Sequence, residues 1–328
     1  MLRNRNTVYE GHDKDMAKDI GRNGIKKSIV YIICIFTLLF CGCSGKEAEL
    51  TVRQEEVDIR GFDGEFKIYF LADSHMSLCD DRDPDVLDKA ASRKEMFRHN
   101  GMDATETFDS IMKDASSRKE DILVLGGDII DSAMYDSIDY LTKELKKPGV
   151  PYIYYMGNHD FEYGTEYFSE KAYSEYLPRL DELHGDASYQ VKEYDDLILF
   201  AADDENSQIS AEALSAYRKI SEKGKPVILL LHVPIEPLTD DTSLLDKCIE
   251  VWGPSDAGKS RVTMGVNGCY PNETTAQFLD LVLAGDSPVE LVLAGHVHFY
   301  HRDMLNDHTL QLITGAAYEG ESMYITVR

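Results

Sequence analysis

The chain alternates short apolar runs with short polar clusters, and five of these clusters begin where an apolar run ends. Successive positions in each run are apolar, which is typical of strands buried on both faces. In open α/β sheets the carboxyl ends of the strands line the crevice in which ligands bind. The pattern therefore predicts an α/β fold with the polar clusters gathered at one edge of its sheets. The five runs lie at 68–71, 122–125, 152–155, 227–231 and 291–293.

Helices are predicted between these strands from the 3.6-residue spacing of apolar positions. We expect Ser210 to cap one helix and Gly224 to end it, and Thr274 with Gln277 to form a capping box on another. No internal repeat is present, so a single domain is predicted. Helices are expected at 165–178, 211–223 and 275–284, a further strand at 187–193 and a β-rich end at 309–327.

The N-terminal segment has the pattern of an export signal. A basic region containing Arg22, Lys26 and Lys27 precedes an apolar stretch at 29–40, and small residues follow. That stretch has 12 residues, whereas a transmembrane helix needs about 20. We therefore interpret residues 1–42 as a cleaved signal.

The junction Phe40-Cys41-Gly42-Cys43 resembles a bacterial lipobox, in which a small residue precedes the lipidated cysteine. Cys43 is the predicted lipid acceptor, with Cys41 and an uncleaved, membrane-tethered signal as the alternatives. The acidic segment 43–64 is expected to be a tether, and residues 65–328 the catalytic domain. This predicts an extracytoplasmic protein that is attached to the membrane by a lipid.

Charge and cysteine content restrict the partners. The 328 residues are 43% apolar and carry a formal charge of −25, and removing residues 1–42 makes it −28, because seven basic and four acidic residues are lost. Nucleic-acid binding depends on Lys and Arg, so that class of partner is disfavoured. A disulfide between Cys248 and Cys269 is permitted outside the cytoplasm. Cys79 would then have no cysteine partner, so the sequence does not imply a fold stabilised by several disulfides.

The polar clusters contain the residue types of a two-metal hydrolytic site. Such a site needs one carboxylate to bridge the ions, and neutral ligands so that the pair keeps net positive charge toward a phosphate. Residues two apart in an extended strand project to the same side, so each Asp-x-His or His-x-His pair is expected to hold one ion. Gly127, Gly157 and Gly295 precede ligands and fit turns where a side chain would crowd the metals. The clusters are Asp73 and His75; Asp128; Asn158, His159 and Asp160; His232; and His296 and His298.

In their order, the clusters resemble the signature of the calcineurin-like metallophosphoesterases: D-x-H, G-D, G-N-H-D/E, H and G-H-x-H, here spanning 73–298. The resemblance implies a four-layer α/β/β/α sandwich of two mixed β-sheets flanked by helices, and two divalent or Fe-type ions such as Mn, Fe or Zn. It also implies that His159 protonates the leaving group while Asp160 orients its imidazole. The implied ligand sets are Asp73, His75, Asp128 and His298 for one ion, and Asp128, Asn158, His232 and His296 for the other.

The function predicted from this resemblance is hydrolysis of a phosphomonoester or phosphodiester by direct attack of a metal-bridging hydroxide. A non-catalytic surface protein that binds metals or acts as an adhesin is the alternative. The segment 253–260 also matches the P-loop pattern G-x-x-x-x-G-K-S, with Lys259 as its lysine. A P-loop follows a buried strand and opens a helix, whereas Gly265, Gly268 and Pro271 follow this segment, so nucleotide hydrolysis is disfavoured.

Overall fold

The computed structural model describes residues 48–147, 149–161, 169–185, 188–237, 243–253, 263–264 and 271–328. The strands are β1 (Thr51–Val57), β2 (Phe66–Leu71), β3 (Ile122–Gly126), β4 (Tyr152–Tyr155), β5 (Tyr189–Glu193), β6 (Ile198–Ala202), β7 (Val227–Leu230), β8 (Val289–Ala294), β9 (His301–Met304), β10 (Leu310–Ile313) and β11 (Glu321–Val327). The α-helices are α1 (Leu87–Met96), α2 (Ala104–Ser117), α3 (Tyr135–Leu145), α4 (Asn158–Phe161), α5 (Glu170–Tyr176), α6 (Asp181–His184), α7 (Ala211–Ser221), α8 (Ser243–Trp252) and α10 (Glu273–Val282), and the 3-10 helices are η1 (Pro84–Val86), η2 (Leu177–Arg179) and η3 (Ala317–Glu319).

The strands form two mixed sheets. The first has the order β1-β11-β2-β3-β4, in which only the β11–β2 pair is antiparallel. The second has the order β5-β6-β7-β8-β10-β9, with antiparallel pairs at both ends. β2, β3 and β4 are parallel to one another, and so are β6, β7, β8 and β10. Within each sheet, the carboxyl ends of these parallel strands therefore lie at one edge.

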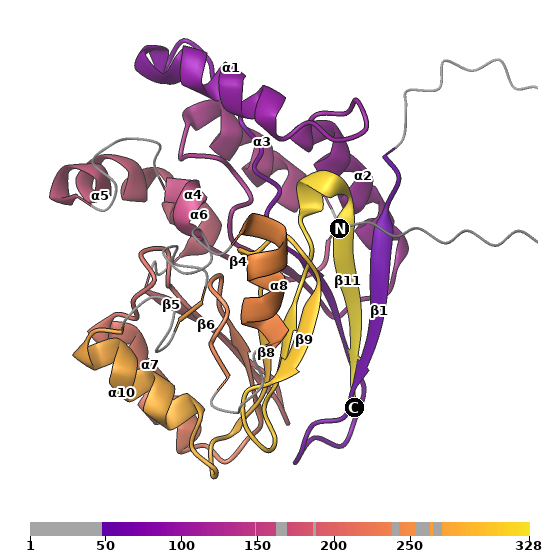
Figure 1. Cartoon of the computed structure of the whole chain (residues 1–328), viewed down its shortest axis with the longest axis vertical. Helices are drawn as coiled ribbons and strands as arrows, with labels where there is room; N and C mark the ends of the chain where they lie inside the picture. Colours follow the sequence, from indigo (N-terminus) through magenta and orange to yellow (C-terminus); the bar gives the residue numbers. More distant parts are fainter. Residues whose placement is uncertain are drawn as a thin grey trace, which may run out of the picture. The chain divides into compact units, whose positions relative to one another are not determined.

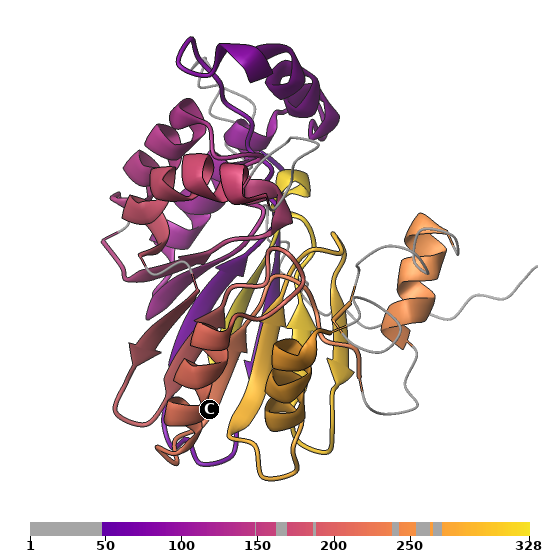
Figure 2. The same ribbon diagram turned by 90° about the vertical axis from the view of Figure 1, so that its left-hand side faces the viewer.

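Alternation along the strands divides the apolar side chains among three cores. In β2, Ile68 and Phe70 join the core that also contains Leu199 and Leu230 of the second sheet. Tyr69 and Leu71 instead pack with residues of α2 and α3. The outer face of the second sheet packs against α7 and α10. Figures 1 and 2 show these helices outside the paired sheets. The predicted four-layer arrangement of two mixed sheets flanked by helices is thus confirmed, because both faces of both sheets are buried.

The five predicted strands are present, and so is the helix that begins after Ser210, whose side chain accepts a hydrogen bond from the Ala213 amide. The predicted capping box is wrong. Asn272 caps α10, and its side chain accepts from the Thr275 amide at 2.9 Å. Asn is at least as good a cap as Thr, and it stands one turn before the first buried residues of the helix. Of the helix expected at 165–178, residues 165–168 lie outside the described chain, and α5 and the start of η2 form most of the rest.

The expected tether at 43–64 is partly wrong as well. Residues 51–57 form β1, which pairs with β11 in register from Thr51–Glu321 to Val57–Val327. Glu55 accepts hydrogen bonds from Tyr300 and Arg302 of the second sheet. The acidic composition indicated a solvated segment, but β1 is an edge strand whose side chains are exposed or partly buried except for Val57, and polar residues are normal in such a strand.

We expect Asn272→Ala to lower the free energy of unfolding by about 1 kcal/mol, because the first turn of α10 loses its capping acceptor. Thr274→Ala is the matched control and should change stability by less than about 0.5 kcal/mol. Urea denaturation of both variants measures the difference. A larger loss from Thr274→Ala would restore the capping box that the sequence suggested.

Candidate metal centre

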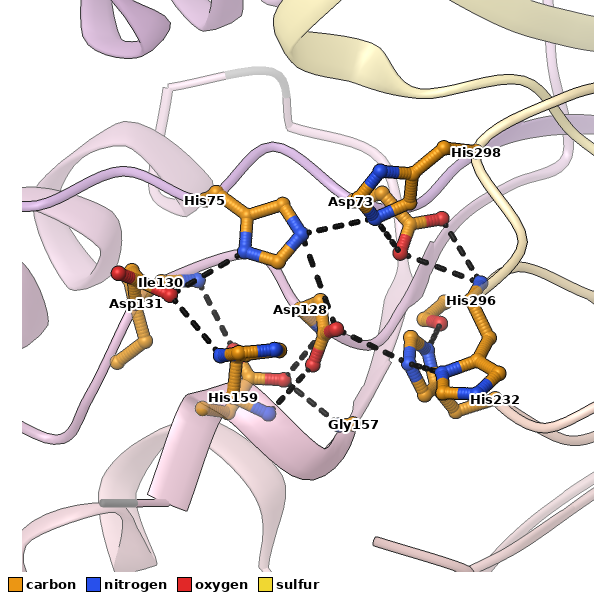
Figure 3. A network of polar contacts seen from close by, with 12 residues as sticks. Asp73, His75, Asp128, Ile130, Asp131, Gly157, His159, His232, His296 and His298 are labelled. Atoms are coloured by element: carbon orange, nitrogen blue, oxygen red, sulfur yellow. Dashed lines mark hydrogen bonds and ion pairs between the residues drawn. The ribbon is translucent and has the colours of Figure 1, made fainter. Parts of the chain in front are cut away.

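Polar residues from both sheets meet beyond the carboxyl ends of five strands. Asp73 and His75 follow β2, Asp128 follows β3, and Asn158 opens α4 directly after β4. His232 follows β7, and His296 and His298 follow β8. Figure 3 shows the labelled aspartate and histidine side chains converging, with Asp128 near the middle. The structure therefore brings together all the aspartate and histidine ligands that the sequence suggested.

Ligand atoms form two groups, each with three of the four residues of one expected set. In one, atoms of Asp73, His75 and His298 all lie within 4.8 Å of one another. In the other, the same holds for Asp128, His232 and His296. Each group contains one carboxylate and two imidazoles, a donor set suited to divalent transition metals and zinc.

Asp128 lies between the two groups. Its Oδ2 is 3.2 Å from Nε2 of His232 in its own group and 3.8 Å from Nε2 of His75 in the other. The side chain is 1% exposed. A carboxylate that faces imidazoles of both groups has the position required of a bridging ligand.

The backbone at these ligands is strained. Asp73, His75, Asp128, His296 and His298 all have positive φ angles, between 49° and 72°. Non-glycine residues rarely adopt this left-handed conformation, and it concentrates at functional sites. The expectation that each pair projects from an extended strand is therefore wrong. The strands end before the ligands, and left-handed turns place Asp73 with His75 in one group but divide His298 and His296 between the two groups.

The glycines before the ligands have the expected steric role. A Cβ on Gly127 would lie 2.6 Å from Nδ1 of His232, and one on Gly295 would lie 2.8 Å from the carboxylate of Asp73. Gly127 also has a φ of 83°. Any side chain at these two positions would displace the ligands.

Hydrogen bonds at the far nitrogens hold two imidazoles in one orientation. Nδ1 of His232 is 2.8 Å from the carbonyl of Gly126, and Nδ1 of His75 is 3.2 Å from Oδ1 of Asp131. An Nδ1–H that donates to these oxygens leaves the Nε2 lone pair facing Asp128. This is the usual outer support of a metal-binding histidine.

Asn158 has a buried side-chain oxygen, Oδ1, for which no hydrogen-bond partner is found among the described residues. A buried amide oxygen without a partner is costly, and a metal ion would satisfy it. Together with the two carboxylate–imidazole groups, this atom makes the residues present a good fit to two ions.

The electrostatics of the site also favour bound cations. Burial disfavours the ionised form of Asp128, but the surrounding imidazoles hold its pKa well below the usual range. For His232, burial lowers the pKa, yet the carboxylates of Asp128, Asp73 and Asp204 raise it to about 10. The carboxylates thus attract positive charge into a buried volume, either as protons or as metal ions.

Asp160 does not orient His159, contrary to the expectation from the sequence. Its Oδ2 accepts hydrogen bonds from the amides of Asp128 and Gly157 at 2.6 and 2.7 Å, and its Oδ1 accepts from Ile130 at 2.9 Å. Burial and the nearby Asp128 carboxylate raise the pKa of Asp160 to about 7. Asp160 instead links two turns by hydrogen bonds: the turn that contains Asp128 and the turn that contains Asn158.

The partner of His159 is Asp131, whose Oδ1 lies 3.2 Å from Nδ1 of the imidazole. Arg93 of α1 binds the same carboxylate through Nε and Nη2, at 2.5 and 2.8 Å, and its Nη2 is 3.2 Å from Nδ1 of His159. Burial lowers the pKa of His159, but the carboxylates of Asp128 and Asp131 raise it by a larger amount, so the net shift of the pKa is upward. Asp131 thus contacts both His75 and His159 (Figure 3).

Sequence reasoning missed both Asp131 and Arg93. Asp131 stands three residues after Asp128 in the same turn, which was an available signal. No signal in the sequence pointed to Arg93, because it lies in a segment without motifs. It reaches the site only because α1 packs beside it.

The structure contradicts the P-loop alternative, because a helix and not a strand precedes the segment. Gly253 follows helix α8, and its amide donates to Ile249 of that helix, whereas a P-loop follows a buried strand. Lys259 and the rest of the pattern lie outside the described residues, as do Cys43 and Cys269. Among the residues that are described, no helix is long and apolar enough to cross a membrane.

Known proteins resemble this chain in sequence and in structure. A probable cyclic nucleotide phosphodiesterase of Fibrobacter succinogenes is 27% identical over 135 residues, which are 40% of this chain and 49% of that protein. The chain thus matches about half the length of this curated relative. A dimetal phosphatase from Danio rerio superposes with a TM-score of 0.48 and 13% identity, over 77% of this chain and 88% of that one. A protein from Thermus thermophilus gives a TM-score of 0.45 and 13% identity, over 78% and 92%.

A family model described as calcineurin-like phosphoesterase matches residues 66–300. The matched region contains all five ligand-bearing turns and most of both sheets. The chain therefore belongs to the calcineurin-like phosphoesterases.

Proposed function

We propose that this protein is an extracytoplasmic phosphoesterase, attached to the membrane by a lipid on Cys43, that hydrolyses a phosphomonoester or phosphodiester by direct attack of water on phosphorus. The observation that carries the proposal is the position of Asp128 between the two ligand groups, 3.2 Å from His232 and 3.8 Å from His75. Two ions held there would supply positive charge for the phosphate and acidify the attacking water. The phosphodiesterase name of the Fibrobacter relative is consistent with this class of substrate.

The proposed ligand sets follow from the two groups and the orphaned amide oxygen. Asp73, His75, Asp128 and His298 would hold one ion. Asp128, Asn158, His232 and His296 would hold the other. With four protein ligands, an ion that accepts more than four ligands, such as Mn or Fe, would keep positions open for water and for phosphate oxygens.

His159 is the proposed general acid. Its side chain is 29% exposed, so it can reach a substrate that enters from solvent. In the protonated form, Nδ1–H donates to Asp131 and Nε2–H faces away from that carboxylate, available for the oxygen of a leaving group. A positioned acid of this kind contributes about 10²- to 10⁴-fold in rate.

Extracytoplasmic location and lipid attachment rest on the sequence alone. The basic region, the 12-residue apolar stretch and the small residues before Cys43 support export and lipidation. The strongly acidic composition adds that a phosphorylated substrate must be attracted locally, by the metal ions and Arg93, rather than by the protein surface as a whole.

Asp128→Asn should abolish both the binding of two ions and turnover, because one substitution weakens both ligand sets. Asn158→Ala should weaken mainly the ion held with His232 and His296. Purified protein loaded with Mn²⁺ would be assayed on aryl phosphate monoesters and diesters, and its metal content measured by mass spectrometry. Two tightly bound ions with normal turnover in Asp128→Asn would contradict the site, and an inactive, fully loaded wild type would favour the non-catalytic alternative.

His159→Ala should slow hydrolysis of alkyl phosphoesters much more than that of nitrophenyl esters, because a nitrophenolate leaves without a proton. The selective part of the loss should reach about 10² or more. Metal content should stay near that of the wild type. Equal losses on both substrates, or loss of an ion, would show that His159 is a ligand or a substrate-positioning group.

Asp131→Asn and Asp160→Asn form a matched pair that separates the two carboxylates. Asp131→Asn should reproduce part of the leaving-group selectivity of His159→Ala and weaken metal binding at His75 about 10- to 100-fold, because both imidazoles lose their partner. Asp160→Asn should instead lower the free energy of unfolding by about 1–3 kcal/mol, because the new side-chain NH2 would face backbone amides that now donate to the carboxylate. Leaving-group assays and urea denaturation measure both effects. A leaving-group effect confined to Asp160→Asn would reinstate that residue as the partner of His159.

A further inference from the structure

The described chain begins at the edge of the first sheet that carries the metal ligands. β1 runs parallel to β11, and β11 runs antiparallel to β2. The start of β1 therefore lies level with the end of β2, which precedes Asp73, and is separated from it by β11. The end of β1 lies at the opposite edge, beside Arg328. Figure 1 shows β1 descending from the end of the sheets near α1 toward the C-terminus.

Backbone contacts join this starting point to the site through η3. The Thr51 amide donates to the carbonyl of Gly320 at 2.9 Å, and Gly320 follows η3 directly. The Tyr318 amide of η3 donates to the carbonyl of Asp73 at 3.1 Å, and the Tyr318 ring lies 5.5 Å from the ring of His298. The start of β1 is therefore connected to two proposed metal ligands, Asp73 and His298, through the contacts of η3.

The peptide between this point and the proposed lipid is short. Cys43 precedes Ala48 by five residues. However those residues are arranged, five residues span at most about 18 Å. β11 has seven residues, which at about 3.3 Å each separate the two edges of its sheet by roughly 23 Å. A lipid on Cys43 would therefore keep Ala48, at the edge of the sheet that carries the metal ligands (the metal edge), within about 18 Å of the membrane surface.

Helix α1 gives this edge an exposed apolar surface. Within 87–98 there are four basic residues against two acidic ones, and three of the basic ones, Arg93, Lys94 and Arg98, form ion pairs with Asp131, Asp103 and Glu95. Leu87 and Met96 are 41% and 61% exposed, and Met96 is the most exposed of the large hydrophobic residues described. Ala48 and Glu49 line the same cavity as His99 and Asn100, which follow α1. Exposed apolar side chains among basic ones are typical of surfaces that contact membranes.

α1 also touches the catalytic machinery. Arg93 binds Asp131, and its Nη1 donates to the sulfur of Met96 at 3.4 Å. Phe97 stacks on His75 with ring centroids 4.0 Å apart and planes at 6°. A membrane that contacts Met96 would therefore lie close to the proposed metal ligands.

We propose that the metal edge of the domain faces the membrane surface, and that the substrate is a phosphoester carried on the head group of a membrane lipid. The inference rests on the proposed function, because it assumes that Cys43 is lipidated and that the metal site hydrolyses phosphoesters. The occupant of the α1 surface is then the lipid bilayer itself.

The orientation can be measured with single tryptophans in the lipidated full chain, since Trp252 is the only tryptophan. Met96→Trp and, as the matched control, Arg328→Trp would each be placed in a Trp252→Phe background. Vesicles of phosphatidylcholine with nitroxide-labelled head groups should quench Trp at 96 at least twofold more strongly than Trp at 328. Equal quenching, stronger quenching at 328, or a chain without lipid on Cys43 overturns the proposal.

The substrate class can be tested by lengthening the tether. An insertion of about twenty Gly and Ser residues before Ala48 lengthens the tether about fivefold, and because its average reach grows as the square root of residue number, the effective concentration of membrane at the site should fall about twofold. Hydrolysis of phosphatidic acid or phosphatidylglycerol in phosphatidylcholine vesicles should fall by about that factor, while hydrolysis of a soluble aryl phosphate is unchanged. Turnover of the aryl phosphate without turnover of either lipid overturns this inference and leaves the proposed function standing. Failure on all substrates, with metal loaded, refutes the proposed function itself.

Discussion

The shared position of Asp128 is the constraint on which the rest of the site depends. Its carboxylate faces an imidazole from each sheet, so β3 must end at a fixed height relative to both β2 and β7. Asp160 secures that height by accepting hydrogen bonds from the turn after β3 and the turn after β4. The His159 amide adds a hydrogen bond to Oδ1 of Asp128 at 2.7 Å. A small shift of any of these turns would move the bridging carboxylate away from one ligand group.

This arrangement has a cost in backbone energy, which the rest of the fold must offset. Five ligands adopt left-handed φ angles, each costing on the order of 1–3 kcal/mol where the residue is not glycine. The strands behind these turns are almost completely buried and pack into three cores. The two packed sheets hold these turns in left-handed conformations that an isolated peptide would rarely adopt. The site is thus preorganised, as catalysis by charge stabilisation requires.

Asp131 couples the metal centre to the proposed acid, and α1 to both. One carboxylate contacts His75, His159 and Arg93, so a displacement of α1 would alter a metal ligand and the proton donor together. The same helix presents Met96 and Leu87 to solvent at the edge where the chain enters the first sheet. Contact of α1 with a lipid surface would therefore change the position of Arg93, and through Asp131 the positions of His75 and His159.

The sequence by itself determined the buried strands and the order of the ligand clusters, because buried strands and metal ligands restrict residue type at each position. It could not show that β1 adds to the first sheet, since an exposed edge strand tolerates the same polar residues as a solvated tether. Nor could it place Asp131 and Arg93 at His159, or assign Asp160 to the turns around Asp128. Adjacent residues such as His159 and Asp160 point in different directions once the backbone turns. Only the tertiary structure decides which side chains from distant segments meet, because that depends on how β-strands, turns and α1 pack in space.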